Sequence, residues 1–135
     1  MACAETFATL RIFSEVMHPD DIGSALGISS TDSIPRDPNS KYKPRREQNF
    51  WSRTTKDDFD STNNVEHLEF LVSLVSDKDT ILSSLREKGC LTDIFCYWDS
   101  TGQGGPILSV EMMKELVRLG LGVSWDIYFD DEGNA

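Results

Sequence analysis

The sequence lacks the residues that most metal sites and disulfide-stabilised folds require. Its 135 residues include three cysteines and two histidines, and no two cysteines form a C-x-x-C pair. A structural zinc site needs about four clustered Cys or His ligands, and an odd number of cysteines gives no complete disulfide framework. We therefore expect no metal and no cofactor, and we expect reduced cysteines that pack as small apolar side chains.

Long hydrophobic segments are missing as well. No apolar run approaches the roughly 20 residues that a membrane-spanning helix needs. The N-terminal residues, MACAETFATLRIF, have neither the basic region nor the continuous apolar stretch of a secretory signal peptide. These absences predict a soluble cytoplasmic protein that makes no contact with a membrane.

Positive charge is scarce, and it is concentrated in one segment. The chain has 13 basic and 23 acidic residues, for a net charge of −10. Seven of the 13 bases lie in residues 36–56, which contain only two acids. An acidic chain repels nucleic acids and anionic membranes at long range, so the composition argues against a nucleic-acid partner and favours a partner with a basic surface.

The hydrophobic pattern changes between a period of two and a period of 3.6, which predicts an α+β fold. Period two indicates strands over residues 6–13 and 123–129. The segment 50–54 and the almost continuously apolar segment 91–98 are also predicted to be strands, and residues 29–49 are predicted to form a long loop or irregular hairpin. Helical spacing indicates helices over residues 19–26, 65–89 and 110–119, and a break at 76–79 makes the second of these either two helices or one bent helix.

These elements follow one another in the order β-α-β-β-α-β-α-β. The order predicts a single mixed, largely antiparallel sheet of about five strands with about three helices, which lie largely on one face. The almost continuously apolar segment 91–98 is predicted to be the central strand, covered on both faces. We expect residues 1–135 to form one domain, in which residues 130–135 are a solvated acidic tail.

Several segments carry a resemblance to a known family. These are the strand that contains Trp51, the run from Tyr97 to Gly105 (YWDSTGQGG), and the stretch from Asp126 to Tyr128. Together with the order of the elements, they make residues 6–129 similar to the bacterial domain-of-unknown-function family 4279. The resemblance implies a fold and a bacterial source, and it implies no activity and no functional residues.

No catalytic motif is present. Residues Gly102–Gly105 follow a strand and precede a helix, where backbone amides can hold an anion. The Gly-Lys-Ser/Thr of a phosphate-binding loop is absent, because Pro106-Ile107-Leu108 follows instead. Neither histidine lies in a recognisable nucleophile–base motif. The glycine segment is therefore predicted to be a tight turn, with anion binding as the alternative.

One basic segment stands out in the acidic chain. Lys41, Lys43, Arg45 and Arg46 carry four positive charges within six residues, next to Tyr42. Their mutual repulsion and the adjacent prolines predict a mobile loop without regular structure. Such a loop either offsets part of the net charge or contacts an anionic group.

Two functional interpretations follow from these observations. The first is a small, acidic, non-enzymatic interaction module, comparable to a toxin-neutralising immunity protein, that binds a partner with a basic surface. The second is a domain that binds a small molecule or an anion in a cleft near Trp51, Trp98 and Gly102–Gly105. An enzyme is one form of this second interpretation. The candidate ligand-binding residues are Arg45, Arg46, Trp51, Arg53, Tyr97, Trp98, Asp99, Gly104 and Asp126.

Overall fold

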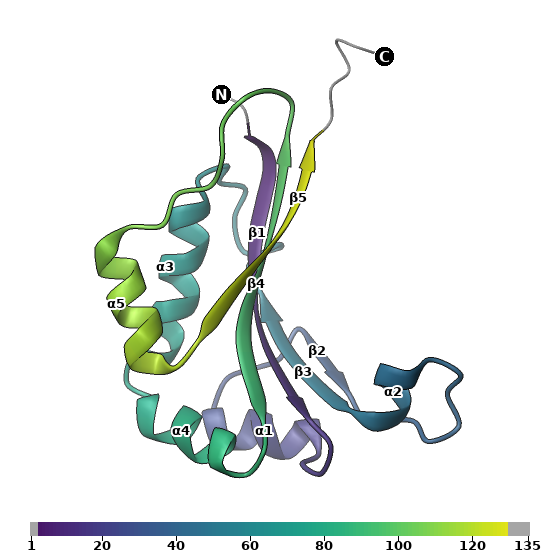
Figure 1. Cartoon of the computed structure of the whole chain (residues 1–135). Helices are drawn as coiled ribbons and strands as arrows, with labels where there is room; N and C mark the ends of the chain where they lie inside the picture. Colours follow the sequence, from purple (N-terminus) through teal and green to yellow (C-terminus); the bar gives the residue numbers. More distant parts are fainter. Residues whose placement is uncertain (1–2, 130–135) are drawn as a thin grey trace.

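The computed structural model describes residues 3–129, in which five strands form one mixed sheet (Figure 1). The strands are β1 (Cys3–Ser14), β2 (Asp32–Ile34), β3 (Asn49–Thr54), β4 (Leu91–Ser100) and β5 (Gly122–Phe129). The helices are α1 (Pro19–Leu26), α2 (Lys43–Glu47), α3 (Asn64–Val75), α4 (Asp79–Glu87) and α5 (Val110–Leu119). The predicted acidic tail, residues 130–135, lies outside the described residues.

The sheet is built around its first strand. The strand order is β2-β3-β1-β4-β5, so that β1 is central and β2 and β5 are the edges. The pairs β2–β3, β3–β1 and β1–β4 are antiparallel, whereas β4 and β5 are parallel and connected through α5. The predicted α+β class with a mixed sheet of five strands is confirmed.

The predicted number and order of elements were wrong in two places. The described residues form five helices, and the observed order is β-α-β-α-β-α-α-β-α-β. A short helix, α2, forms within the basic segment because Pro44 lies in its first turn, where a missing N–H has no helical partner to lose. The second difference is that the segment counted as one helix is two, since the break after Val75 separates α3 from α4.

Helix ends follow the local sequence signals closely. The His18 side chain accepts a hydrogen bond from the Asp20 N–H at the start of α1, and Gly27 ends that helix with a φ of 67°. Asn63 caps α3 and Ser109 caps α5 in the same way, each through a side-chain oxygen that accepts from a backbone N–H. Capping groups therefore explain why these helices begin where they do.

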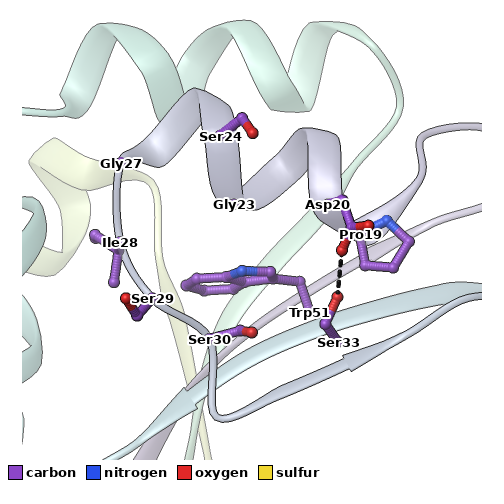
Figure 2. Close-up of a pocket in the computed structure, with 10 residues that line it drawn as sticks. All are labelled: Pro19, Asp20, Gly23, Ser24, Gly27, Ile28, Ser29, Ser30, Ser33 and Trp51. Atoms are coloured by element: carbon purple, nitrogen blue, oxygen red, sulfur yellow. Dashed lines mark hydrogen bonds between the residues drawn. The ribbon is translucent and has the colours of Figure 1, made fainter.

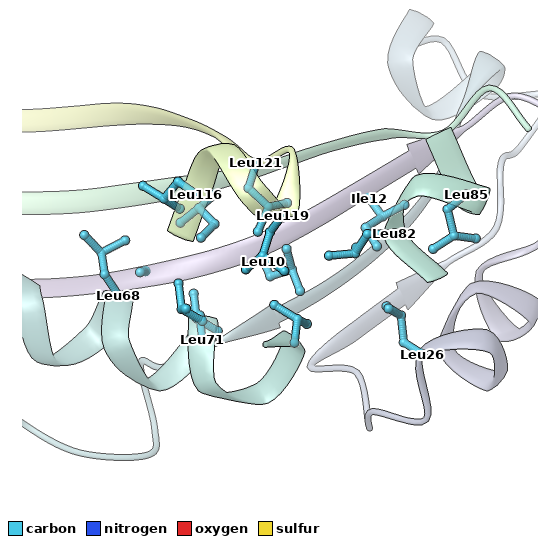
Figure 3. Packing of buried hydrophobic residues seen from close by; sticks show 14 of the residues in the cluster. Leu10, Ile12, Leu26, Leu68, Leu71, Leu82, Leu85, Leu116, Leu119 and Leu121 are labelled. Atoms are coloured by element: carbon cyan, nitrogen blue, oxygen red, sulfur yellow. The ribbon is translucent and has the colours of Figure 1, made fainter. Parts of the chain in front are cut away.

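The core lies between one face of the sheet and four helices (Figure 3). Alternate residues of β1, which are Ala8, Leu10 and Ile12, point into it and are 0–1% exposed. Figure 1 shows α1, α3, α4 and α5 on this side of the sheet. Leucines from these helices fill the space against β1, including Leu26, Leu71, Leu82, Leu116 and Leu119. None of the described helices is both long and apolar enough to span a membrane.

The prediction that segment 91–98 is a central strand buried on both faces was wrong. Ile94, Cys96 and Trp98 are buried against the helices, but Leu91 on the opposite face is 61% exposed. The helices cover only one face, so alternate side chains of the continuous apolar run in β4 lie in two different environments, the core and the open face of the sheet. Its second face belongs to the surface described in the next subsection.

We predict that burial on the helix-covered face, and not hydrophobicity alone, sets the effect of core substitutions. Leu10→Ala should lower the free energy of unfolding by about 2–5 kcal/mol, because it leaves a cavity in the core. The matched substitution Leu91→Ala, in the neighbouring strand, should cost less than about 1 kcal/mol since Leu91 is 61% exposed. Urea unfolding measures both values, and equal losses would contradict the one-sided core.

We also predict different reactivities for the three thiols. Burial, and then the charge of Asp93, raise the pKa of Cys96 to about 12, and Cys90 is 3% exposed. Cys3 is only partly buried. One thiol should therefore react with Ellman's reagent at pH 8 in the native protein, and three should react in denaturant, since the thiolate is the nucleophile. Rapid modification of all three in the native protein would contradict this core.

Candidate functional site

The sequence-predicted site residues lie in five separate places. Trp51 is beneath α1, and Trp98 and Gly104 line a hollow at the other end of the sheet. Arg53 lies beside α3, while Arg45 and Arg46 are in α2. Tyr97, Asp99 and Asp126 share one face of the sheet. The last group is the one that the fold brings together.

Trp51 is a core residue, and Figure 2 shows where its indole lies. Its indole lies under α1, and a side chain at Gly23 would place a Cβ 3.0 Å from the indole nitrogen. A hollow of about 330 Å³ beside the indole is edged by serines and by Asp20, whose Oδ1 accepts a hydrogen bond from Ser33. The indole closes this hollow but is only 1% exposed. It therefore offers almost no surface to a ligand.

Trp98 lines a different hollow, of about 380 Å³, beside the glycine segment. Asn64 fixes that segment, because its Nδ2 donates to the Ile107 carbonyl at 2.6 Å and its Oδ1 accepts from the Ile107 N–H at 3.0 Å. None of the described residues that line it is charged. An anion in this hollow would depend on neutral donors alone.

The two tryptophans do not share a cleft. Trp51 pairs with Ile12 of β1, and Trp98 pairs with Thr6 of the same strand. Six residues of an extended strand span about 20 Å. The single cleft that the second interpretation places near both tryptophans is therefore divided into two separate hollows.

The cationic candidates are already engaged or remote. Arg53 Nη2 lies 3.1 Å from both carboxylate oxygens of Asp58, and its guanidinium lies over the Phe70 ring. Arg45 and Arg46 are exposed in α2, which lies at a corner of the molecule beyond the ends of β2 and β3 (Figure 1). The segment predicted to be an irregular loop thus contains one helical turn, and Arg46 donates to the Ser40 carbonyl at 3.2 Å.

His67 has a structural role in the part of the chain that the structure describes. It is 1% exposed and stacks on Phe59. Its Nε2 lies 2.7 Å from the Ser61 carbonyl, and its Nδ1 lies 2.6 Å from Thr55 Oγ1. Since a carbonyl only accepts, Nε2 carries a hydrogen. The Thr55 hydroxyl in turn accepts from the Ala8 N–H, so His67 fixes the loop after β3 to β1.

The helix-free face of the sheet carries a row of three aromatic rings. Phe7 of β1 lies opposite Tyr97 of β4, and their rings stack with centroids 4.8 Å apart. The ring of Tyr128 in β5 follows, 5.3 Å from that of Tyr97. Half-buried and exposed rings thus form a continuous aromatic surface across three strands.

Carboxylates border this row. Asp126 is level with Tyr97, while Asp99 is level with Glu5 on one side and with Tyr128 on the other. We call this surface the aromatic–acidic patch, and it consists of Glu5, Phe7, Tyr97, Asp99, Asp126 and Tyr128. Sequence reasoning selected Tyr97, Asp99 and Asp126 as site residues but missed Tyr128, Glu5 and Phe7, of which Glu5 and Phe7 come from β1. Only the pairing of β1 with β4 places those two beside Tyr97.

The carboxylates give the patch a negative potential, which contributes to raised pKa values of Tyr97 and Tyr128. Partial burial, followed by the charges of Asp99 and Glu5, raises the pKa of Tyr97. A hydrogen bond to the Asp126 carboxylate, followed by the charge of that group, raises the pKa of Tyr128. The carboxylates oppose a second negative charge on the face, and for the same reason they favour a cation there.

A neighbouring part of the same face already holds a guanidinium. Arg11 forms a bidentate pair with Asp93, with N–O distances of 2.9 and 2.7 Å. Its guanidinium lies 4.7 Å from the Phe95 ring centroid and 5.3 Å from that of Phe13. The protein therefore binds its own arginine with a carboxylate and aromatic rings, which are the components of the aromatic–acidic patch.

The patch itself is only partly occupied by an internal cation. Lys56 Nζ lies 5.3 Å from the Phe7 ring centroid. Among the described residues, no arginine or lysine is found over the ring of Tyr97 or Tyr128. In addition, no group of three His, Cys, Asp or Glu side chains in residues 3–129 could hold a metal ion.

Asp126→Asn should lower the pKa of Tyr128 toward its ordinary value, because the mutation removes both the charge and its strong hydrogen bond. Ultraviolet titration of tyrosinate measures this change, and Asp37→Asn, near α2, serves as a control. An unchanged titration would contradict the predicted contact. The raised pKa values of Tyr97 and Tyr128 stabilise the fold below the unfolded pKa of about 10, and this contribution is lost as pH rises through the folded values.

Comparison with known proteins gives one match. A family model described as "Domain of unknown function (DUF4279)" matches residues 4–130, which is nearly the whole chain. No curated protein matches the sequence, and no solved structure matches the fold.

Proposed function

The chain belongs to the DUF4279 family, and we propose that this member is an acidic interaction module that binds a basic protein surface through its aromatic–acidic patch. The observation that carries the proposal is the row of Phe7, Tyr97 and Tyr128 bordered by the carboxylates of Glu5, Asp99 and Asp126. Aromatic faces attract cations, and adjacent carboxylates add a direct charge interaction.

The geometry suits an arginine or lysine side chain of the partner. Because Phe7 and Tyr97 stack on one another, a guanidinium would reach the aromatic row mainly at the exposed ring of Tyr128, beside the carboxylates of Asp99 and Asp126. Arg11 makes this combination of contacts with Phe95 and Asp93 on the same face. The net charge of −10 would steer a basic partner toward the molecule before contact.

The two hollows give less support to a small-molecule-binding function than the patch gives to protein binding. The indole of Trp51 is buried, and the hollow near Trp98 is lined without a charged residue. The aromatic–acidic patch lies on an open sheet face, where a protein surface can approach. This is why we place an interaction module before a small-molecule or anion-binding domain.

Toxin-neutralising immunity proteins are the class of module that we put first. An acidic domain of this kind would act by covering a basic functional surface of its partner, and it would need no catalytic group of its own. The proposal places the protein in the bacterial cytoplasm, where its free cysteines would stay reduced. These assignments rest on analogy with other small acidic modules.

Binding to a defined cationic probe tests the proposal. The probe is a fluorescein-labelled peptide of alternating arginine and glycine, and the same peptide with glutamate in place of arginine is the negative probe. The double variant Asp99→Asn/Asp126→Asn should bind the arginine peptide about tenfold more weakly in fluorescence anisotropy, since two charge contacts of about 0.7 kcal/mol each are lost. Tyr97→Leu should also weaken binding, because it removes the central ring of the aromatic row.

The matched control is Asp77→Asn/Glu111→Gln, which removes two exposed carboxylates from the helix side. Its net charge is the same as that of the Asp99/Asp126 variant. It should bind the arginine peptide nearly as well as the unaltered protein at moderate salt, where charges beyond about 8–10 Å are screened. If the control loses as much affinity as the Asp99/Asp126 variant, attraction is a property of net charge and the patch is not the binding site.

A further inference from the structure

The two edges of the sheet differ in how well they are protected against pairing with another strand. The edge strand β2 has only three residues, and one of them is Asp32. Short strands and charged residues are the usual protection of an edge. The other edge strand, β5, has eight residues (GVSWDIYF), and Asp126 is its only charged residue. Long, apolar edges of this kind are templates for an added strand.

The exposed side chains of β5 gather in its C-terminal half. Ile127, Tyr128 and Phe129 are 53%, 50% and 59% exposed, respectively. Ile127 and Phe129 are level with Trp98 and Ser100 of β4, on the helix-covered face. In Figure 1, however, this half of β5 runs clear of the helices. These apolar side chains and the free strand edge therefore lie together without a described partner.

We propose that this edge is a homodimer interface, in which β5 pairs antiparallel with β5 of a second copy and joins two sheets into one of ten strands. A two-fold axis perpendicular to the sheet requires that paired residues lie on the same face. In every possible register, one residue of β5 therefore pairs with the same residue of the second copy, and the register is centred on that residue. The side chains of β5 show which of these registers is most favourable.

The register centred on Ile127 is the one that the charges and apolar groups favour. It pairs Ile127 with itself and Trp125 with Phe129, and both pairs are apolar. On the other face it places each Asp126 opposite the Tyr128 of the second copy. A carboxylate has several acceptor positions, so Asp126 can accept from the partner hydroxyl as well as from its own Tyr128.

Neighbouring registers are less favourable. A register centred on Asp126 would place two carboxylates directly opposite each other, and like charges in that position destabilise a strand pair. A register centred on Tyr128 would match only residues 127–129 of the described strand and would leave Trp125 without an apolar partner. Centring on Trp125 would pair the strand start, next to the end of α5, and would leave the exposed Ile127 and Phe129 away from the centre.

The dimer is expected to be weak, because an interface formed by one pair of strands is small and each copy has a net charge of −10. Sedimentation equilibrium from about 5 to 500 μM should show a mass that rises from 15.2 kDa toward twice that value. Ile127→Lys should hold the protein at 15.2 kDa. Val16→Lys, at an exposed apolar residue after β1, is the matched control and should still dimerise.

Cysteine cross-linking tests the register separately. In a Cys3→Ser background, Ile127→Cys should form a disulfide-linked dimer on mild oxidation, since directly opposite Cβ atoms are about 4.5–5.5 Å apart and small shifts allow a disulfide. Ser124 is also exposed on the same strand but does not face itself in this register, so Ser124→Cys should stay monomeric.

A monomer at every concentration would overturn the dimer. This holds even if β5 pairs with a strand of another protein, because the proposal names a second copy of this chain as the partner. Equal cross-linking of Ser124→Cys and Ile127→Cys would overturn the register. The dimer and the proposed function are tested separately, because Ile127→Lys alters the helix-covered face and leaves every side chain of the aromatic–acidic patch in place. At concentrations at which the unaltered protein is monomeric, Ile127→Lys should therefore leave binding of the arginine peptide unchanged.

Discussion

The strict alternation of side chains along β1 is the constraint on which the rest of the structure depends. This strand is paired on both sides, with β3 and with β4. Its even-numbered residues from Ala8 to Ile12 are buried, whereas Phe7, Thr9, Arg11 and Phe13 point to the helix-free face. A shift of one residue would exchange the two sets and place Arg11 in the core. The position of the core and the chemistry of the open face are therefore set together.

The open face is stabilised by polar and aromatic contacts in place of a second layer of helices. The bidentate pair between Arg11 and Asp93 links β1 to β4, and the guanidinium covers Phe95 and Phe13. This arrangement protects part of the apolar surface from water without burying it in the core. Towards the other end of β1, Phe7 and Tyr97 protect one another by stacking. Aromatic rings with carboxylates thus stabilise the fold in the half of the open face around Arg11. In the half around Tyr97, the same combination is available to bind a partner.

Much of the fold could be predicted because local signals agree with it. The caps at Asn63 and Ser109 and the stop at Gly27 place helix ends within a residue or two of those observed. The alternation in 6–13 and 123–129 indicates strands correctly. Segment 91–98 is where the inference failed, because an apolar residue such as Leu91 does not reveal whether a helix or solvent lies on its side. The helix at Lys43–Glu47 was missed since its proline and its like charges suggested an irregular loop.

For the candidate site, the sequence by itself determined which side chains share a strand face: Tyr97 with Asp99, and Asp126 with Tyr128, because residues two apart in a strand point the same way. It also determined that the chain is acidic and that Lys41, Lys43, Arg45 and Arg46 form its basic segment. Only the tertiary structure decided that Glu5 and Phe7 join Tyr97, that Trp51 and Trp98 are separated, and that β5 is an edge. The physical reason is that strand order and register arise from contacts between residues far apart in the chain, and no local pattern records them.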